Sequence, residues 1–429
     1  MHSSSYRYLD FVLVLLLVLL TANPYMAEKK IFFLAPLFIL ILFRIGNKLS
    51  YLYKINWKHS GIIFFVLGYE LTHAIIFDNW NILNMFRITF EMYLVYLIIK
   101  IINIHFIKIY CSIIFYLAII SLVLYPLMYT YAGPVLMKYA ENTFVMSISK
   151  LNYKAPTLIF YTFDWGYITK ATNIYRNAGF TWEAGAFAIY LNIALIFKLF
   201  LDKSNKSLAN KYNIVYIISI ISTFSTTGYI VLFIILLAYL LHYKKKIFLK
   251  WSLLLIAIPL SYQIYYSAPF LQDKIDTQYK ESVNGKSHNR FSSAILDIND
   301  VMKRPLLGWS RDTEILFGEE VTYKAHRPNG ITNLLRCYGF IYFIFLFTLL
   351  YFSFYKLGKT STIKSAPLFS MFFITVLLLS AFSQLVFDKP FFRSMVFWGD
   401  FMFLTSIPKG KFQQLRHKYK SHFRIIRSQ

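Results

Sequence analysis

Ionisable side chains occur in pairs inside two strongly apolar stretches of the chain. Glu70 and His73 are three residues apart in one stretch, and Arg87 and Glu91 are four apart in the next. On a helix these spacings place each pair on one face. Ionisable groups inside a bilayer usually face a cavity or a partner. Each pair could therefore carry protons or ions, or form a mutually neutralised pair inside a helical bundle. The spacing of Arg87 and Glu91 favours neutralisation, because each offers the compensation that burial demands.

Three polar runs between apolar stretches contain the other chemically capable residues. The run 176–187 contains an arginine, a Trp-Glu pair and two glycines. The run 290–308 begins with an arginine and ends in Arg-Pro-Leu-Leu-Gly, and the run 326–336 contains one histidine, two asparagines and two arginines. Arginine binds oxyanions through paired hydrogen bonds, and Glu and His are common proton acceptors.

The composition indicates that a bilayer surrounds the elements that carry these residues. Hydrophobic residues make up 57% of the 429 positions and aromatic residues 20%, and the mean hydropathy is +0.51. A water-soluble core of this length could not hide so much apolar surface. The net charge of +25 does not indicate nucleic-acid binding, because the basic residues punctuate apolar runs. Cys111 and Cys337 are too isolated to suggest a disulfide framework or a thiolate metal site.

Apolar runs near the length that spans a bilayer predict an all-α membrane protein with twelve transmembrane helices. The first run also resembles the start of a signal peptide, but Asn23 and Pro24 before the second run favour a helical hairpin. Ser225 to Gly228 predict a turn that divides the long stretch 213–241. The predicted helices are 9–22, 31–43, 60–77, 82–101, 106–131, 183–201, 213–224, 227–241, 247–266, 330–355, 367–386 and 391–408.

Lysine and arginine in the short loops predict the orientation, because cytoplasmic loops are enriched in them. Four cationic loops and the basic tail 409–429 fall on one side of a twelve-helix topology, so both termini are expected in the cytoplasm. The same topology predicts six parts. They are helices 1–5 in 1–131, an outer segment at 132–182, helices 6–9 in 183–266, a large outer segment with short helices at 267–329, helices 10–12 in 330–408, and the tail.

The motifs in these runs resemble the O-antigen polymerase and ligase family of bacterial surface-polysaccharide assembly. They are TWEAGAF at 181–187, STTGY at 225–229, PLLG at 305–308, and a His and an Asn before CYGF at 337–340. The resemblance covers roughly residues 160–400. The sequence departs from the family pattern at Arg327 and Pro328, which separate His326 from Asn329, and at Ala184, where the family often has Pro.

The resemblance implies a GT-C-like glycosyltransferase in the bacterial inner membrane, with no metal and no cofactor. Its substrate would be an undecaprenyl-diphosphate-linked oligosaccharide, extended at the outer face of the membrane as in lipopolysaccharide or capsule synthesis, with membrane lipid and a chain-length regulator as partners. Arg290, with Glu183 and His326 as candidate proton acceptors, would be catalytic. The residues expected to bind substrate are Arg176, Arg327, Asn329, Asn333 and Arg336.

Other interpretations of these residues stay open at the level of sequence. Outer arginines can pair with acids such as Asp297 and Asp300, and His326 can cap a helix. Asp297 and Asp300, three residues apart on one short helix, predict a solvated face rather than a metal site. The enzyme could be a polymerase, which we place first, or a ligase that transfers glycan to lipid A core or protein. A transporter of lipid-linked glycans is the alternative from another class.

Overall fold

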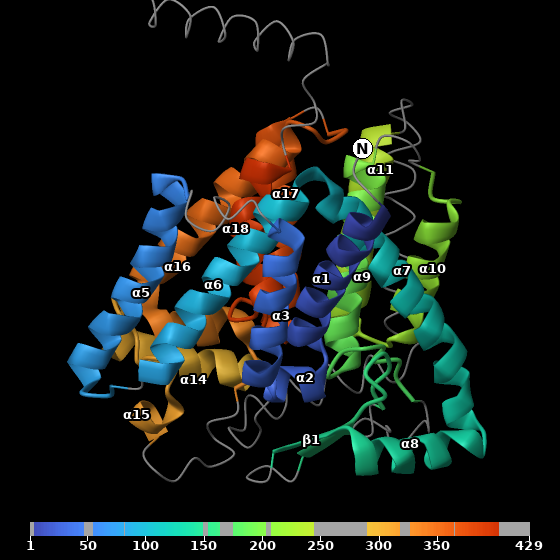
Figure 1. The fold of residues 1–429 in the computed structure, drawn as a ribbon, viewed down its shortest axis with the longest axis horizontal. Helices are drawn as coiled ribbons and strands as arrows, with labels where there is room; N and C mark the ends of the chain where they lie inside the picture. Colours follow the sequence, from blue (N-terminus) through green and yellow to red (C-terminus); the bar gives the residue numbers. More distant parts are fainter. Residues whose placement is uncertain are drawn as a thin grey trace, which may run out of the picture.

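The computed structural model describes residues 4–46, 55–80, 82–148, 153–163, 175–202, 207–243, 290–317, 327–363 and 365–402. Most of these residues are helical, and the helices form one bundle (Figure 1). The coarse prediction of an all-α membrane protein agrees with this architecture, because in a bilayer an apolar segment satisfies its own backbone groups by forming a helix.

Among the described residues, the first half of the bundle contains seven α-helices and a short hairpin. Asn23 turns the chain between the first two helices, where its side chain accepts a hydrogen bond from Met26 N (3.1 Å) and Pro24 occupies the first helical position. The hairpin strands β1 (Val145–Ile148) and β2 (Tyr153–Pro156) are antiparallel. The helices are α1 (Ser4–Ala22), α2 (Pro24–Glu28), α3 (Lys30–Ile45), α5 (Trp57–Phe77), α6 (Ile82–Ile102), α7 (Phe106–Leu124) and α8 (Ala132–Thr143).

The described part of the second half contains eight further α-helices. The predicted break in the stretch 213–241 lies at 223–225, between α10 and α11. The helix α14 starts at Arg290, within the segment predicted to hold short helices, and packs along α16. The helices are α9 (Ala184–Ile196, continued by a π-helical turn at Phe197–Leu201), α10 (Lys211–Ser222), α11 (Thr226–Tyr243), α14 (Arg290–Lys303), α15 (Thr313–Phe317), α16 (Gly330–Gly358), α17 (Ala366–Ser383) and α18 (Pro390–Phe401).

Five helical segments among the described residues are long and apolar enough to cross a membrane. They are Trp57–Phe77, Met85–Tyr129, Ala184–Leu201, Gly330–Gly358 and Ala366–Ser383, and the second of them contains both α6 and α7. Eleven of the twelve predicted ranges overlap helices among the described residues, and the range 247–266 lies outside them. The number of twelve crossings therefore stays a prediction.

The helix α9 lies at the centre of the bundle. Every residue from Ala184 to Ile196 is buried, and α7, α10 and α11 pack against it. A helix that is apolar on nearly all sides can be enclosed by other helices without leaving many polar groups unsatisfied.

The two ends of the bundle differ in structure and charge. The elements α8, β1, α14 and α15 gather at one end, which we call the α14 end, and α1 starts at the other (Figure 1). The described parts of both predicted outer segments therefore lie at the same end. At the opposite end Asp400 contacts Lys58 (3.2 Å), His59 (2.9 Å) and Lys356. Lys58, near the start of α5, and Lys356, near the end of α16, come from two of the four cationic stretches that the sequence predicts on one side.

Candidate functional site

The helix α16 is broken at Gly339, and the 305–309 loop fills the break. Gly339 has φ 65° and ψ −175°, a conformation that L-residues rarely adopt. The freed backbone groups find partners in the loop: Phe340 N donates to Pro305 O (2.8 Å), and Trp309 N donates to Arg336 O (2.8 Å). Gly308 lies against the same break, where any side chain would collide with Gly339 N. The PLLG and CYGF motifs thus form one backbone joint.

Helix α5 holds this joint from the other side. The Tyr69 hydroxyl donates to the carbonyl oxygen of Tyr338, and His73 Nε2 lies 2.7 Å from Leu307 O. Glu70, between them, accepts a hydrogen bond from the Tyr338 hydroxyl (3.1 Å) and lies 3.6 Å from Arg311 Nε. Glu70 and His73 therefore bind the loop and α16 rather than forming a pair that neutralises itself.

The carboxylates of α14 are buried against α16, so the predicted solvated face is wrong. Asp297 is 0% exposed and Asp300 8%. Arg327 Nη1 contacts Asp297 Oδ1 (2.9 Å) and Asp300 Oδ2 (2.6 Å), and Arg336 Nε lies 3.3 Å from Asp297 Oδ1. The Thr332 hydroxyl donates to Asp297 Oδ2 (2.7 Å). The two carboxylates do share a helix face, but these guanidinium partners allow that face to be buried.

Burial also affects the acidity of Asp297. Removal from water raises the pKa of the Asp297 carboxyl above its ordinary value, although Arg336, the Thr332 hydroxyl and Arg327 act in the opposite direction. The ion pairs also involve two residues that were predicted to bind substrate. Arg327 and Arg336 are already paired with acids of this chain.

Beyond these ion pairs, a cavity of about 230 Å³ opens between α3, α6, α16 and the loop before α18. Asn333 lines it, as do Leu385 and Asp388 of that loop. The basic side chains in its wall are Lys30, Arg87, Arg311, Arg327, Arg336 and Arg393. We call it the cationic cavity.

Three of these cations share a single buried carboxylate. Glu91, 1% exposed, lies 2.8 Å from Lys30 Nζ, 3.2 Å from Arg393 Nη1 and 3.9 Å from Arg87 Nε. Asp388, the other acid in the wall, has a side chain 53% exposed and lies 4.0 Å from Lys389. The predicted Arg87–Glu91 pair is thus one part of a cluster with surplus positive charge. A surplus charge in a buried position is costly unless an anion compensates it.

A second cluster stands at the start of α9. Arg290 Nη2 contacts Glu183 Oε1 (3.3 Å), and Arg290 Nε donates to Ser383 O (3.0 Å). Gln384 Nε2 donates to the same Glu183 oxygen, and Trp182 Nε1 donates to Gln384 Oε1 (3.0 Å). Leu385, the next residue, lines the cationic cavity. The loop before α18 therefore contributes adjacent residues to the Glu183–Arg290 cluster and to the cationic cavity.

The other predicted site residues are placed as follows. Arg176 Nε donates to Thr223 O (3.2 Å), and Arg176 does not line the cationic cavity. Asn329 caps α16 by accepting from Ile331 N and Thr332 N (3.1 Å each). Its amide group also donates to Arg290 O (3.4 Å). His326 lies outside the described residues.

Sequence reasoning missed two of the three cations around Glu91. Arg393 lies inside the predicted helix 391–408, and Lys30 directly precedes 31–43. An arginine within an apolar run is a signal for a buried partner or a cavity. Its partner Glu91 is 302 residues away, and so no local pattern could identify it.

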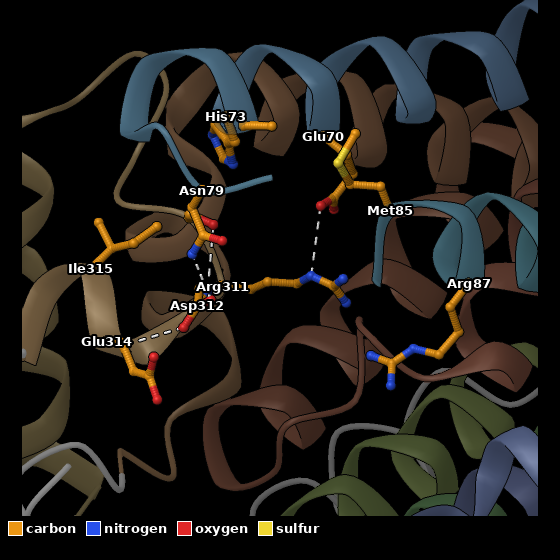
Figure 2. A pocket seen from close by; sticks show the side chains of 11 residues that line it. Glu70, His73, Asn79, Met85, Arg87, Arg311, Asp312, Glu314 and Ile315 are labelled. Carbon is orange, nitrogen blue, oxygen red and sulfur yellow. Dashed lines mark hydrogen bonds and ion pairs between the residues drawn. The ribbon is translucent and has the colours of Figure 1, made fainter. Parts of the chain in front are cut away.

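A polar cavity of about 390 Å³ adjoins the cationic cavity, because Arg87 and Arg311 line both. Figure 2 shows Arg311 reaching across it toward Glu70, with Arg87 on the α6 side. Asn79 Nδ2 donates to Asp312 Oδ2 (2.8 Å), and Asp312 Oδ1 accepts from Glu314 N (3.1 Å).

Comparison with models of protein families and with curated proteins finds no match to this chain. The residues and their geometry are therefore the basis for any assignment of function.

Proposed function

We propose that the chain is a glycosyltransferase that joins lipid-linked oligosaccharide units into a longer polysaccharide. The donor is a polyprenyl diphosphate-linked glycan, and the acceptor is a sugar hydroxyl of another such unit. The observation that carries the proposal is the cationic cavity, where Lys30, Arg87 and Arg393 surround the single carboxylate of Glu91.

The charge of the cavity suits a diphosphate. Lys30, Arg87 and Arg393 share one carboxylate, that of Glu91, among the described residues, and guanidinium groups bind phosphate oxygens bidentately. A diphosphate gains negative charge as it leaves the sugar, so fixed cations stabilise the transition state more than the ground state. The cavity lies beside α14, at the end of the bundle that the sequence predicts to face outward.

The proposed reaction is a single displacement at the anomeric carbon. The acceptor oxygen forms a bond to this carbon, and the bond between carbon and phosphate oxygen breaks, so the polyprenyl diphosphate leaves with the bonding electrons. The acceptor proton passes to Glu183 or to His326. Arg290 contacts Glu183 (3.3 Å) and holds this carboxylate in position next to the loop that lines the cavity. Arg176 binds further along the substrate.

The setting of this reaction is proposed with it. Twelve crossings place both termini in the cytoplasm and the α14 end at the outer face of a bacterial inner membrane, where lipid-linked glycans are available. The lysines at the end opposite α14 support this orientation, because cytoplasmic ends are enriched in lysine and arginine. Lys58 and Lys356 both contact Asp400 there.

A matched pair of substitutions tests the cavity. Arg87→Ala removes one cation from Glu91, which keeps Lys30 and Arg393. Lys58→Ala removes one cation from Asp400, which keeps His59 and Lys356. We expect Arg87→Ala to lower the rate of polymer formation in membrane extracts by ~10–100-fold, and Lys58→Ala to leave it unchanged.

The same extracts separate the alternatives. Normal polymer in Arg87→Ala membranes contradicts the proposal. Transfer of the glycan to lipid A core or protein, without longer lipid-linked chains, indicates a ligase. Arg87→Ala cells in which repeat units fail to reach the outer face, measured with a lectin on intact spheroplasts, indicate a transporter instead.

A further inference from the structure

A groove continues from the cationic cavity to the surface at the α14 end. The polar cavity of Figure 2 shares Asn79, Glu314 and Ile315 with a more open cavity of about 740 Å³ that Phe77 and Trp80 also line. The two cavities therefore adjoin, and we call them together the groove, between the end of α5, the start of α6 and α15. At its inner end, Arg87 and Arg311 belong to the cationic cavity as well.

The lining of this groove has the chemistry of a sugar-binding site. Glu70, Asn79 and Asp312 offer carboxylate and amide groups, which bind pairs of hydroxyls. Trp80 is 53% exposed, and an exposed indole gives a flat apolar surface for the C–H face of a sugar ring. A cavity of about 390 Å³ has the size of a small-ligand site, roughly 300–1,000 Å³.

Among the described residues, two buried polar atoms in the wall have no hydrogen-bond partner. They are His73 Nδ1 and Arg87 Nε, and both residues line the polar cavity. A buried polar atom left unsatisfied is disfavoured, so such atoms usually mark the place of a water or a ligand. A polyhydroxylated ligand can supply both a donor and an acceptor.

We infer that the groove holds the saccharide of the lipid-linked unit whose diphosphate occupies the cationic cavity. This inference rests on the proposed function, since a sugar bonded to a diphosphate must lie directly beside it. The groove is the compartment that shares Arg87 and Arg311 with the cationic cavity. Asp78 and Glu314 make the outer part of the groove negative, so it selects neutral or amino sugars and disfavours acidic sugars.

The test compares two lipids and two tryptophans. The lipids are lipid-linked repeat units extracted from the cells that produce the chain, and polyprenyl diphosphate without sugar. Trp80 lines the groove just after α5, and Trp57 (85% exposed) starts the same helix at its other end. An interfacial anchoring role would affect both tryptophans alike. Affinities are measured by competition binding to the full-length protein in nanodiscs.

We expect the glycosylated lipid to bind more tightly than polyprenyl diphosphate to the unsubstituted protein. Trp80→Ala should weaken binding of the glycosylated lipid about 10-fold and leave polyprenyl diphosphate binding unchanged. Trp57→Ala should change neither. Equal effects of Trp80→Ala on both lipids, or none on either, overturn the groove assignment. If polyprenyl diphosphate binds the unsubstituted protein no better than uncharged polyprenol, the proposed function fails instead.

Discussion

Asp297 shows how strongly a single residue depends on distant partners. Its spacing of three residues from Asp300 is as compatible with a solvated helix face as with a buried one. The contacts that bury Asp297 come from Arg327, Thr332 and Arg336. These partners lie in another polar run, so the local pattern does not contain them. A buried carboxylate with two guanidinium partners stabilises the contact between α14 and α16 only while all the charges stay matched.

Removing this one charge should therefore be severe. Asp297→Asn leaves Arg336 without a carboxylate and Arg327 with Asp300 alone, so we expect a loss of about 3–5 kcal/mol in the free energy of unfolding. Asp202→Asn is the matched control, because Asp202 pairs with Lys198 (2.9 Å) nearer the surface, and should change it by ~1 kcal/mol or less. Equilibrium unfolding in mixed detergent micelles measures both. Similar losses for the two variants contradict a special role for Asp297.

At the scale of elements, the break in α16 positions the site. Gly339 turns the chain so that Arg336 before it faces α14 and the cationic cavity, while the helix after it continues across the bundle. The 305–309 loop replaces the lost helical hydrogen bonds. Because of this arrangement, Arg311, just after the loop, lines the same cavity.

A pair of glycine substitutions tests the break. Gly339→Ala places a methyl group against the backbone of Leu306 at a positive φ, whereas Gly68 in α5 has nothing within 4 Å. We expect Gly339→Ala to destabilise the protein by at least ~1–3 kcal/mol and to abolish polymer formation. Gly68→Ala should be neutral or stabilising by ~0.5–1 kcal/mol. Thermal unfolding in detergent measures both, and an unshifted Gly339→Ala transition would show that the break is dispensable.

The helices were predictable from sequence, and the break was not. Apolar runs of bilayer length have one favourable backbone solution in lipid, so the predicted ranges 60–77 and 367–386 match α5 and α17 closely. Gly339 carries no such signal, because its conformation depends on the docking of Pro305 to Gly308 across the helix. Similarly, Arg290 and Glu183 were chosen separately from motifs, and their contact depends on how α9 and α14 pack.

At the scale of the whole molecule, the two ends define an orientation that labelling can test. Tyr131, before α8 at the α14 end, is 98% exposed, and Trp57, at the opposite end, is 85% exposed. Both native cysteines are buried. We expect a membrane-impermeant maleimide to label Tyr131→Cys in intact spheroplasts, and Trp57→Cys only after permeabilisation. The reverse pattern would place the cationic cavity on the cytoplasmic face and remove it from outer-face chemistry.

The full enclosure of α9 affects how the chain can change over time. On α5, exposed positions such as Phe64 and Ile75 can exchange one apolar side chain for another without touching a neighbour. No residue from Ala184 to Ile196 has that freedom, since each one contacts protein. Divergence in this helix therefore requires matched changes in α7, α10 or α11, and α9 should be the slowest-evolving span of the bundle even though most of it takes no part in chemistry.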